Sequence, residues 1–424
     1  MVVRNSERRT ERTILAALRL PAQRRTAVTE SMEELARLAE AAGAQVVGAV
    51  MQERDAPSPS LYLGKGKVAE LKHLAQDRAA DLLISDDSLT PVQERNLERA
   101  LGLKVIDRTA LILDIFAQRA RTSEGKLQVE LAQLTYLLPR LVGQWKHLER
   151  LGGGIGTRGP GETQLESDRR IIRRRIRHVR EELGHVQRHR RLLRERRRSD
   201  GLPVVALVGY TNAGKTTLLN RLSGSSFPAA DRLFVTLDPA ARLVAAPGHS
   251  AFILTDTVGF IRKLPPQLVS AFKATLEELS DADVLLHVLD ASRPDAPEQL
   301  EAVERILNEL GLAERPSILV LNKIDCRESD NGLRFLIEDS RGVPVSALTG
   351  QGIEELLHRI ELTLRPRMAH AVLQIPYADG PTLALCYQLG RVLRRADEAG
   401  GIRLEVELPL HVLAKVAPYR AGTS

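Results

Sequence analysis

Short apolar runs separated by polar, helix-compatible stretches fill the second half of the chain. Four of the runs have the length of buried strands and lie at residues 202–208, 251–255, 284–289 and 317–321. Continuous apolar runs of this kind are typical of parallel strands that helices cover on both faces. A helix-compatible stretch at 216–222 follows the first run. The pattern predicts an α/β domain at residues 201–366, built on a mostly parallel six-stranded sheet.

A second α/β pattern occupies residues 1–126. It predicts strands at 14–18, 44–50, 81–84 and 104–106, and helices at 32–42, 67–79 and 91–100. Ser31 with Glu34 three residues later has the spacing of a capping box, so Ser31 is the predicted N-cap of the first helix. The tract Leu63-Gly64-Lys65-Gly66-Lys67 is interpreted as a turn and helix start, with a phosphate-binding tract as the alternative. A small α/β layer domain is expected here.

Residues 127–200 carry heptad spacing in place of strands. Apolar side chains step by three and four at Leu127, Leu131, Leu134, Leu138, Leu141, Trp145 and Leu148, and again at Ile172, Ile176, Val179, Leu183, Val186 and Leu193. Two such segments joined by a loop are expected to form a long antiparallel helical hairpin.

The loop of this hairpin has six glycines within residues 152–161. Glycine permits close backbone approach to a partner but costs entropy when it becomes ordered. Two interpretations remain open: a flexible linker, or a loop that becomes ordered on a large partner, with Arg158 on a backbone phosphate.

The C-terminal residues 367–424 predict a small α/β domain. Strands are expected at 370–375 and 403–408, flanking a helix at 383–398 that ends before Gly400-Gly401.

Composition narrows the class of protein. The 424-residue chain has two cysteines, Cys326 and Cys386, which are too few for a disulfide framework and fit a reducing cytosol. No apolar run approaches the ~20 residues that a membrane-spanning helix needs. A cytoplasmic protein without stable membrane insertion is expected, and a monomer is the simplest expectation for its assembly.

The net charge of +7 is concentrated in one stretch: residues 169–198 contain fourteen arginines and three glutamates. Arginine binds phosphate through a bidentate fork, so the stretch favours nucleic acid over a solvated helix face. Aromatic residues make up only 3% of the chain. Duplex or folded RNA is therefore a better expected target than stacked single strands.

Four motifs in fixed order predict a P-loop GTPase domain and a binding site for GTP or GDP. They are the phosphate loop Gly209-Tyr210-Thr211-Asn212-Ala213-Gly214-Lys215-Thr216, then Asp256-Thr257-Val258-Gly259, then Asn322-Lys323-Ile324-Asp325, and finally Ser346-Ala347-Leu348. The phosphate loop surrounds a triphosphate with backbone N–H groups and a lysine. The Asp325 carboxylate can accept from both N1 and N2 of guanine, which selects against adenine.

Hydrolysis of GTP needs charge neutralisation at the phosphates and an oriented water. Lys215, Thr236 and the Gly259 N–H are the predicted catalytic groups, and the Thr216 and Thr236 hydroxyls are the predicted Mg²⁺ ligands. Thr236 lies in the expected mobile segment Phe234-Val235-Thr236-Leu237-Asp238, with Thr255 as the weaker candidate. Phe260, after Gly259, cannot hydrogen-bond a water. Slow unassisted hydrolysis is expected, and Asn212 raises the alternative of a K⁺ ion beside the phosphates.

These motifs, together with Gly156-Thr157-Arg158-Gly159-Pro160-Gly161-Glu162-Thr163-Gln164 and Gln128-Val129-Glu130-Leu131-Ala132-Gln133-Leu134, closely resemble the HflX GTPases. The resemblance extends over about residues 61–348, and the glycine-rich loop is its most specific marker. It implies a GTP hydrolase that binds the large ribosomal subunit and its rRNA and acts on stalled, stressed or idle ribosomes. The other function in view is a GTP-gated switch that docks on RNA or protein, as in ribosome assembly or stress signalling, without splitting ribosomes.

Overall fold

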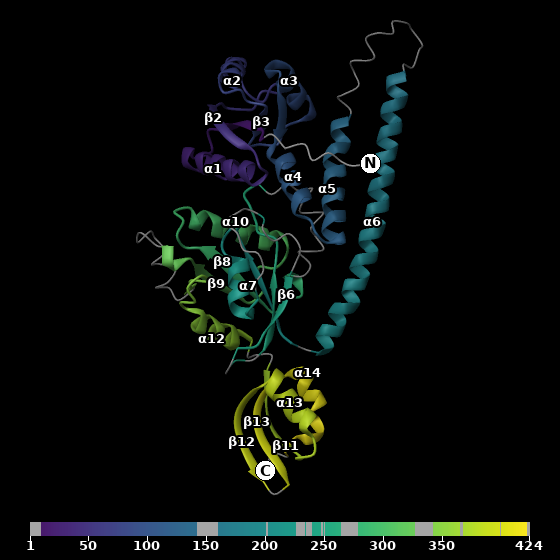
Figure 1. The fold of residues 1–424 in the computed structure, drawn as a ribbon, viewed down its shortest axis with the longest axis vertical. Coiled ribbons are helices and arrows are strands. Elements are labelled where there is room, and N and C mark those ends of the chain that lie inside the picture. The colour runs from purple at the N-terminus through teal and green to yellow at the C-terminus, as the bar shows by residue number, and fades with distance from the viewer. Residues whose placement is uncertain are drawn as a thin grey trace. The chain divides into compact units, whose positions relative to one another are not determined.

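A computed structural model describes residues 10–141, 160–200, 202–225, 234, 240–246, 249, 251–263, 279–326, 342–364, 368–398 and 400–421 (Figure 1). The chain divides into two compact units, one of residues 1–184 with 263–271 and the other of residues 185–262 with 272–424, so one boundary falls inside a long helix. No helix in the described ranges is both long and apolar enough to cross a membrane.

The N-terminal part of the chain forms a four-stranded parallel sheet in the order β2-β1-β3-β4. Its strands are β1 (Arg12–Arg19), β2 (Gln45–Glu53), β3 (Leu82–Ser85) and β4 (Lys104–Asp107). The helices between them are α1 (Arg25–Ala41), α2 (Lys65–Asp77) and α3 (Pro91–Leu101). Gly64 caps α2, so the Gly-Lys tract is a turn and helix start, as interpreted from the sequence.

The predicted N-cap at Ser31 is wrong, because α1 begins about two turns earlier, at Arg25, with Arg24 as its N-cap. Ser31 instead lies buried inside the helix, and its hydroxyl donates to Asp86 Oδ2 at 2.8 Å. The buried Arg108 guanidinium pairs with Asp86 and with Glu34, each at 2.6 Å. Ser31 and Glu34 therefore serve a buried ion-pair network. A buried cation requires such partners, and the local capping pattern cannot reveal them.

Two helices follow β4 before the hairpin's second arm. They are α4 (Arg108–Arg119), capped by Asp107, and α5 (Ser123–Arg140), capped by Thr122. The most buried face of α5 includes Val129, Ala132 and Tyr136. The predicted seam residues Leu127, Leu131, Leu134 and Leu138 are only half-buried. The predicted seam residues of this arm are therefore less buried than the face that carries Val129, Ala132 and Tyr136.

The second arm is α6 (Pro160–Asp200), of 41 residues, and it lies beside α5 in Figure 1. Its seam is confirmed at Ile176, Val179 and Leu183, which are all buried. The predicted Trp145 and Leu148, and residues 152–159 of the glycine-rich loop, lie outside the described residues.

The central domain has the predicted mostly parallel six-stranded sheet, in the order β10-β9-β8-β5-β7-β6, with β6 antiparallel to β7. The strands are β5 (Val204–Gly209), β6 (Ala240–Val244), β7 (Phe252–Asp256), β8 (Val284–Asp290), β9 (Ser317–Asn322) and β10 (Gly342–Pro344). The helices α7 (Lys215–Ser223) and α12 (Ile353–Leu364) share one core with the sheet. The Ala296 end of α10 (Ala296–Glu309) packs into a separate cluster with Leu289 and Leu321. The functional motifs follow the carboxyl ends of these strands, where ligands bind in open α/β sheets.

The C-terminal domain corrects one prediction. The helix expected at 383–398 is α13 (Gly380–Leu389) followed by the strand β12 (Arg391–Glu398). The strand lies at the edge of the sheet β11-β13-β12, beside β13 (Gly401–Pro409); β11 is Met368–Ile375. Its register places Arg391 opposite Glu407 and Arg394 opposite Glu405. Backbone pairing with β13 therefore decides the strand, and a local helix pattern cannot reveal that partner. The short helices α14 (Leu410–Lys415) and η5 (Ala417–Tyr419) complete the domain.

Candidate nucleotide-binding site

The phosphate loop joins β5 to α7, and two glycines allow its path. Gly209 has φ +149°, and a Cβ there would lie 2.2 Å from the Val288 carbonyl oxygen. Gly214 has φ +94°, and a Cβ there would lie 2.1 Å from Asn322 Nδ2. Both positions combine an unfavourable φ for other residues with close neighbouring atoms, so only glycine fits. The loop consequently presents its backbone at the N-terminus of α7, where N–H groups and the helix dipole favour an anion.

Lys215, at the start of α7, is buried, and its ammonium donates to the carbonyl oxygens of Gly209 at 3.0 Å and Tyr210 at 2.8 Å. Burial lowers the pKa of Lys215 to about 8, and the Asp256 carboxylate opposes that shift. The Lys215 charge and burial also lower the pKa of His287, in β8, to about 4, with burial the larger cause. The Lys215 cation therefore lies near a neutral imidazole, and a phosphate would restore full protonation of that cation.

The Thr216 hydroxyl donates to Asp256 Oδ2 at 2.8 Å, and Asp256 is fully buried at the end of β7. Hydroxyl and carboxylate oxygens are the donor type that Mg²⁺ prefers, and Mg²⁺ at nucleotide sites takes most of its ligands from phosphates and water. These two groups fit that arrangement. No group of three or more His, Cys, Asp or Glu side chains elsewhere in the described ranges could hold a metal ion.

The segment after Asp256 is hydrogen-bonded to the phosphate loop. The Phe260 N–H donates to Gly209 O at 3.1 Å, and the Thr211 N–H donates to Phe260 O at 2.8 Å. A Cβ on Gly259 would lie 2.9 Å from Lys215 Nζ, so the chain passes directly beside the ammonium. Phe260 itself is buried. Its ring offers no hydrogen bond to a water, and its backbone connects this segment to the loop that binds phosphate.

Thr257 and Val258 complete this motif as buried residues, and the Thr257 hydroxyl donates to Leu207 O at 2.7 Å. Burial of both residues and the Thr257 hydrogen bond fix the backbone path of this motif against β5. Phe234 is buried with φ +57°. The predicted Val235, Thr236, Leu237 and Asp238 lie outside the described residues.

Asn322 connects the base-recognition motifs to the phosphate loop. Its side-chain amide donates to Ala213 O at 2.8 Å and accepts from the Ala347 N–H at 3.0 Å. The Lys323 ammonium pairs with Asp290 Oδ2 at 2.8 Å. These contacts hold three motifs that are distant in the sequence together at one end of the sheet.

Asp325 lies in the short helix η3 (Ile324–Cys326), and its carboxylate is exposed. A hydrogen bond from the Ser346 hydroxyl, more than any other contact, keeps the pKa of Asp325 below its ordinary value. Ser346 is fully buried, whereas Leu348 is exposed. An ionised carboxylate is an acceptor with two oxygens, so Asp325 can accept two hydrogen bonds from one ligand.

Two contributing residues, Asp290 and Arg221, were missed from the sequence, and so was the contact that the predicted Tyr210 makes through its hydroxyl. Asp290 positions Lys323, and the Arg221 guanidinium donates to the carbonyl oxygens of Ala347 and Leu348. The Tyr210 hydroxyl accepts from the Arg262 N–H at 2.5 Å. Asp290 ends an apolar strand as Asp256 does, and that signal could have identified it. The partners of Arg221 and Tyr210 lie 126 and 52 residues away, so no local pattern reveals them.

Comparisons with known proteins identify the family. Four family descriptions match the chain: GTP-binding GTPase N-terminal at 29–117, GTP-binding GTPase Middle Region at 119–197, 50S ribosome-binding GTPase at 204–323, and HflX C-terminal domain at 337–414. The GTPase HflX of Caldanaerobacter subterraneus subsp. tengcongensis is 48% identical over 92% of this chain and 90% of its own. The chain belongs to the HflX GTPase family.

A further relative, the GTPase HflX of Escherichia coli K12, is 45% identical over 90% of both chains. Among solved structures, the complex of SsGBP with GDP is 28% identical and covers 84% of this chain and 99% of its own, with a TM-score of 0.48. The resemblance inferred from the sequence is confirmed, and the protein is a GTP hydrolase.

The lowered pKa of Lys215 predicts that nucleotide affinity weakens as the pH rises through about 8. Above that pH the free protein loses the ammonium proton, and phosphate binding must restore it. Affinity should therefore be constant below pH 8 and fall above it by up to about tenfold per pH unit.

Calorimetry with GDP between about pH 7 and about pH 9, in buffers of different ionisation enthalpy, measures both affinity and proton uptake. Uptake should rise from near zero toward one proton per complex. Constant affinity without proton uptake across this range would contradict the assignment of Lys215 as the phosphate-binding cation.

Proposed function

We propose that this HflX GTPase binds the large ribosomal subunit and remodels or splits stalled or idle ribosomes, with GTP binding and hydrolysis controlling its association. The observation that carries the proposal is Phe260: the position expected to orient the hydrolytic water holds a buried apolar ring whose backbone is bonded to the phosphate loop. A water-orienting side chain is a standard part of GTP hydrolysis. A GTPase without one there depends on a partner or an ion for fast turnover.

The family description of the GTP-binding domain, 50S ribosome-binding GTPase, supports the large subunit and its rRNA as that partner. The arginine-rich α6 supports an RNA surface. We further propose Mg²⁺ on the Thr216 and Thr236 hydroxyls, with K⁺ at Asn212 as a possible activating ion. A cytoplasmic monomer with domains at 1–126, 127–200, 201–366 and 367–424 completes the proposal.

Large ribosomal subunits should raise the GTPase rate by about 10²-fold, the range that one preorganised transition-state group supplies. The measurement is phosphate release against subunit concentration in K⁺ and in Na⁺, with small subunits as the control. Equal turnover with and without large subunits in both salts would contradict ribosome activation. If turnover is raised in K⁺ but not in Na⁺, whether or not large subunits are present, the activating group that Phe260 does not supply is the K⁺ ion.

Light scattering of intact ribosomes separates the two functions. Scattering that falls when GTP is present and stays constant when GDP is present supports splitting. Co-sedimentation that requires GTP but leaves the particles intact favours the alternative, a GTP-gated switch that docks without remodelling.

A further inference from the structure

A cavity of about 650 Å³ lies between α5 and α6. Its lining comes from Thr135 and Leu138 of α5 and from Glu166, Arg170, Arg173, Ile176, Arg177 and Arg180 of α6. The volume is within the range of cavities that bind small molecules or single ligand groups. Nothing in the GTP site uses this cavity.

The cavity has one strongly cationic wall. Arg170, Arg173, Arg177 and Arg180 recur at steps of three, four and three residues, which places all four on one face of α6. At 1.5 Å per residue they extend over about 15 Å. None of the four pairs with a carboxylate in the described ranges. By contrast, the neighbouring Arg175 makes a bidentate pair with Glu130 at 2.5 and 2.9 Å and is already engaged.

Both helices also contribute an apolar side chain to the lining, Leu138 from α5 and Ile176 from α6. Leu138 is half-buried and Ile176 is 7% exposed, and the Thr135 hydroxyl is turned back to Leu131 O at 2.7 Å. A bare phosphate would leave these apolar groups without a partner. A ligand with an anionic group and a flat, weakly polar group would contact both the arginines and the apolar side chains.

We propose that this cavity takes one unpaired nucleotide of an RNA strand. The arginines bind its phosphate and the adjacent phosphates, and the base lies against Leu138 and Ile176. Guanidinium groups bind phosphate in bidentate fashion, and the Glu166 carboxylate can accept from a base amino group, as carboxylates do from cytosine. The inference rests on the proposed function in naming ribosomal RNA as the source of that strand.

An acidic peptide is the competing occupant. Its carboxylates would also pair with the arginines, but it has no planar group for Leu138 and Ile176. RNA loops and bulges display unstacked bases together with phosphates, so they match both the arginines and the apolar side chains.

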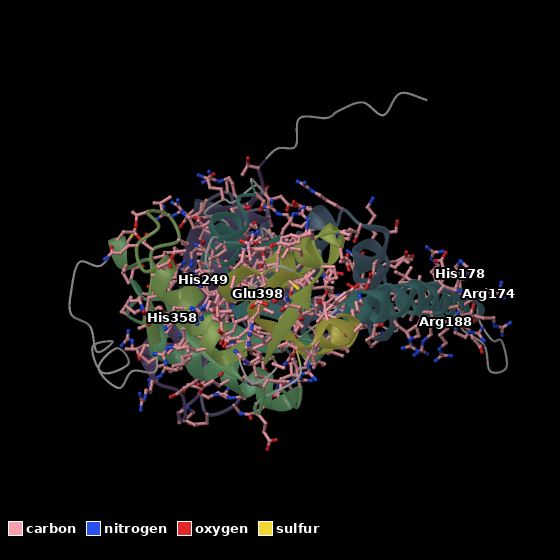
Figure 2. The ribbon with its side chains drawn as sticks, turned by 90° about the horizontal axis from the view of Figure 1, so that it is seen from below. Arg174, His178, Arg188, His249, His358 and Glu398 are labelled. Carbon is pink, nitrogen blue, oxygen red and sulfur yellow. The ribbon has the colours of Figure 1, made fainter. Side chains whose placement is uncertain are left out.

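The test compares two double variants of the full-length protein with equal loss of charge. R173Q/R177Q removes two cavity arginines, whereas R174Q/R188Q removes two exposed arginines of the same helix that do not line the cavity (Figure 2). A third variant, Thr135→Phe, fills the cavity without changing charge. The probes are a fluorescent hairpin RNA with one bulged nucleotide, the same hairpin with an abasic bulge, and polyglutamate.

The bulged hairpin should bind wild type about tenfold more tightly than the abasic one, because only the bulged hairpin has a base to bury against Leu138 and Ile176. R173Q/R177Q should lose about tenfold in affinity for the bulged hairpin, and its salt slope should be shallower by about 1.4, or 0.7 for each lost contact. Thr135→Phe should lose the preference for the bulged base at unchanged salt slope.

Equal losses in the two double variants would overturn the inference, because the stripe would then act only as a diffuse charge. Polyglutamate binding as tight as RNA binding would also overturn it. Co-sedimentation with large subunits is measured for the same proteins. If wild type binds the bulged hairpin through the cavity but does not bind the large subunit, the proposed function is refuted and the inference about the cavity stands. If wild type binds the large subunit but does not bind the bulged hairpin through the cavity, only the inference about the cavity is refuted.

Discussion

Lys215→Met should lower the affinity for GTP and GDP by about 30-fold to several thousand-fold. The ammonium is the cation that the structure buries beside Gly209, Tyr210 and Gly259. Truncating one partner of a buried charge pair costs ~2–5 kcal/mol, which corresponds to about 30- to several thousand-fold in binding. Methionine preserves the apolar stem, so the packing around α7 remains.

The free variant should be no less stable than wild type. Burial lowers the pKa of Lys215 from 10.5 to about 8, so the folded protein binds the Lys215 proton less tightly than the unfolded chain does. Below pH 8 both states carry this proton, and its burial destabilises the folded protein. Wild type should therefore gain stability between about pH 8 and pH 10.5, and Lys215→Met should lack that gain.

Thermal unfolding against pH, paired with fluorescence titration of a GDP analogue, separates the two effects. Lys215→Arg, which keeps a charge in a bulkier group, is the matched comparison. A Met variant that binds GTP within about threefold of wild type would exclude Lys215 as the phosphate ligand.

The GTP-binding domain was predictable because its signals are local. Buried parallel strands read as apolar runs, and each motif follows the end of such a run, so strand positions and motif positions confirm each other. The sheet, the phosphate loop and its continuation into α7 follow the predicted order.

Errors occurred where a distant partner decides the local structure. Ser31 looks like an N-cap until Asp86 and Arg108 are placed beside it. Residues 391–398 look helical until Glu405 and Glu407 lie across from them in β13. The leucines of α5 are half-buried for the same reason, because a distant element decides which face is buried. Helix α5 packs against α4, and Leu138 borders the cavity beside α6.

In the nucleotide site, too, local signals were predictable and contacts between distant residues were not. The residues that would contact phosphate and base are consecutive in the motifs, and the sequence names them. The residues that hold the motifs together, among them Arg221 and Asp290, act through contacts between elements. The sequence therefore predicts chemistry more completely than it predicts the contacts that position it.

Asp325→Asn should shift nucleotide preference from GTP to XTP. The carboxylate of Asp325 is exposed, ionised and held by the Ser346 hydroxyl, so it can accept from N1–H and the 2-amino group of guanine. An asparagine offers one acceptor and one donor. Its amide would oppose the guanine amino group and would donate to the oxygen that xanthine carries at that position.

The expected loss for GTP is about 10²- to 10⁴-fold, because two hydrogen bonds to a charged acceptor contribute ~1.5–3 kcal/mol each. XTP should bind the variant more tightly than GTP, and ATP should remain weak for both proteins. Phosphate release and competition binding with GTP, XTP and ATP measure the change.

Asp397→Asn, an exposed carboxylate of β12 outside the GTP site, is the matched control for loss of one negative charge, and it should keep the preference for GTP. A second control is the wild type itself, which should reject XTP by a factor similar to the one that the variant shows for GTP. Equal binding of GTP and XTP by wild type would mean that the Asp325 carboxylate does not recognise the base. Selection against ATP would then have to come from the backbone around Ser346 and Ala347.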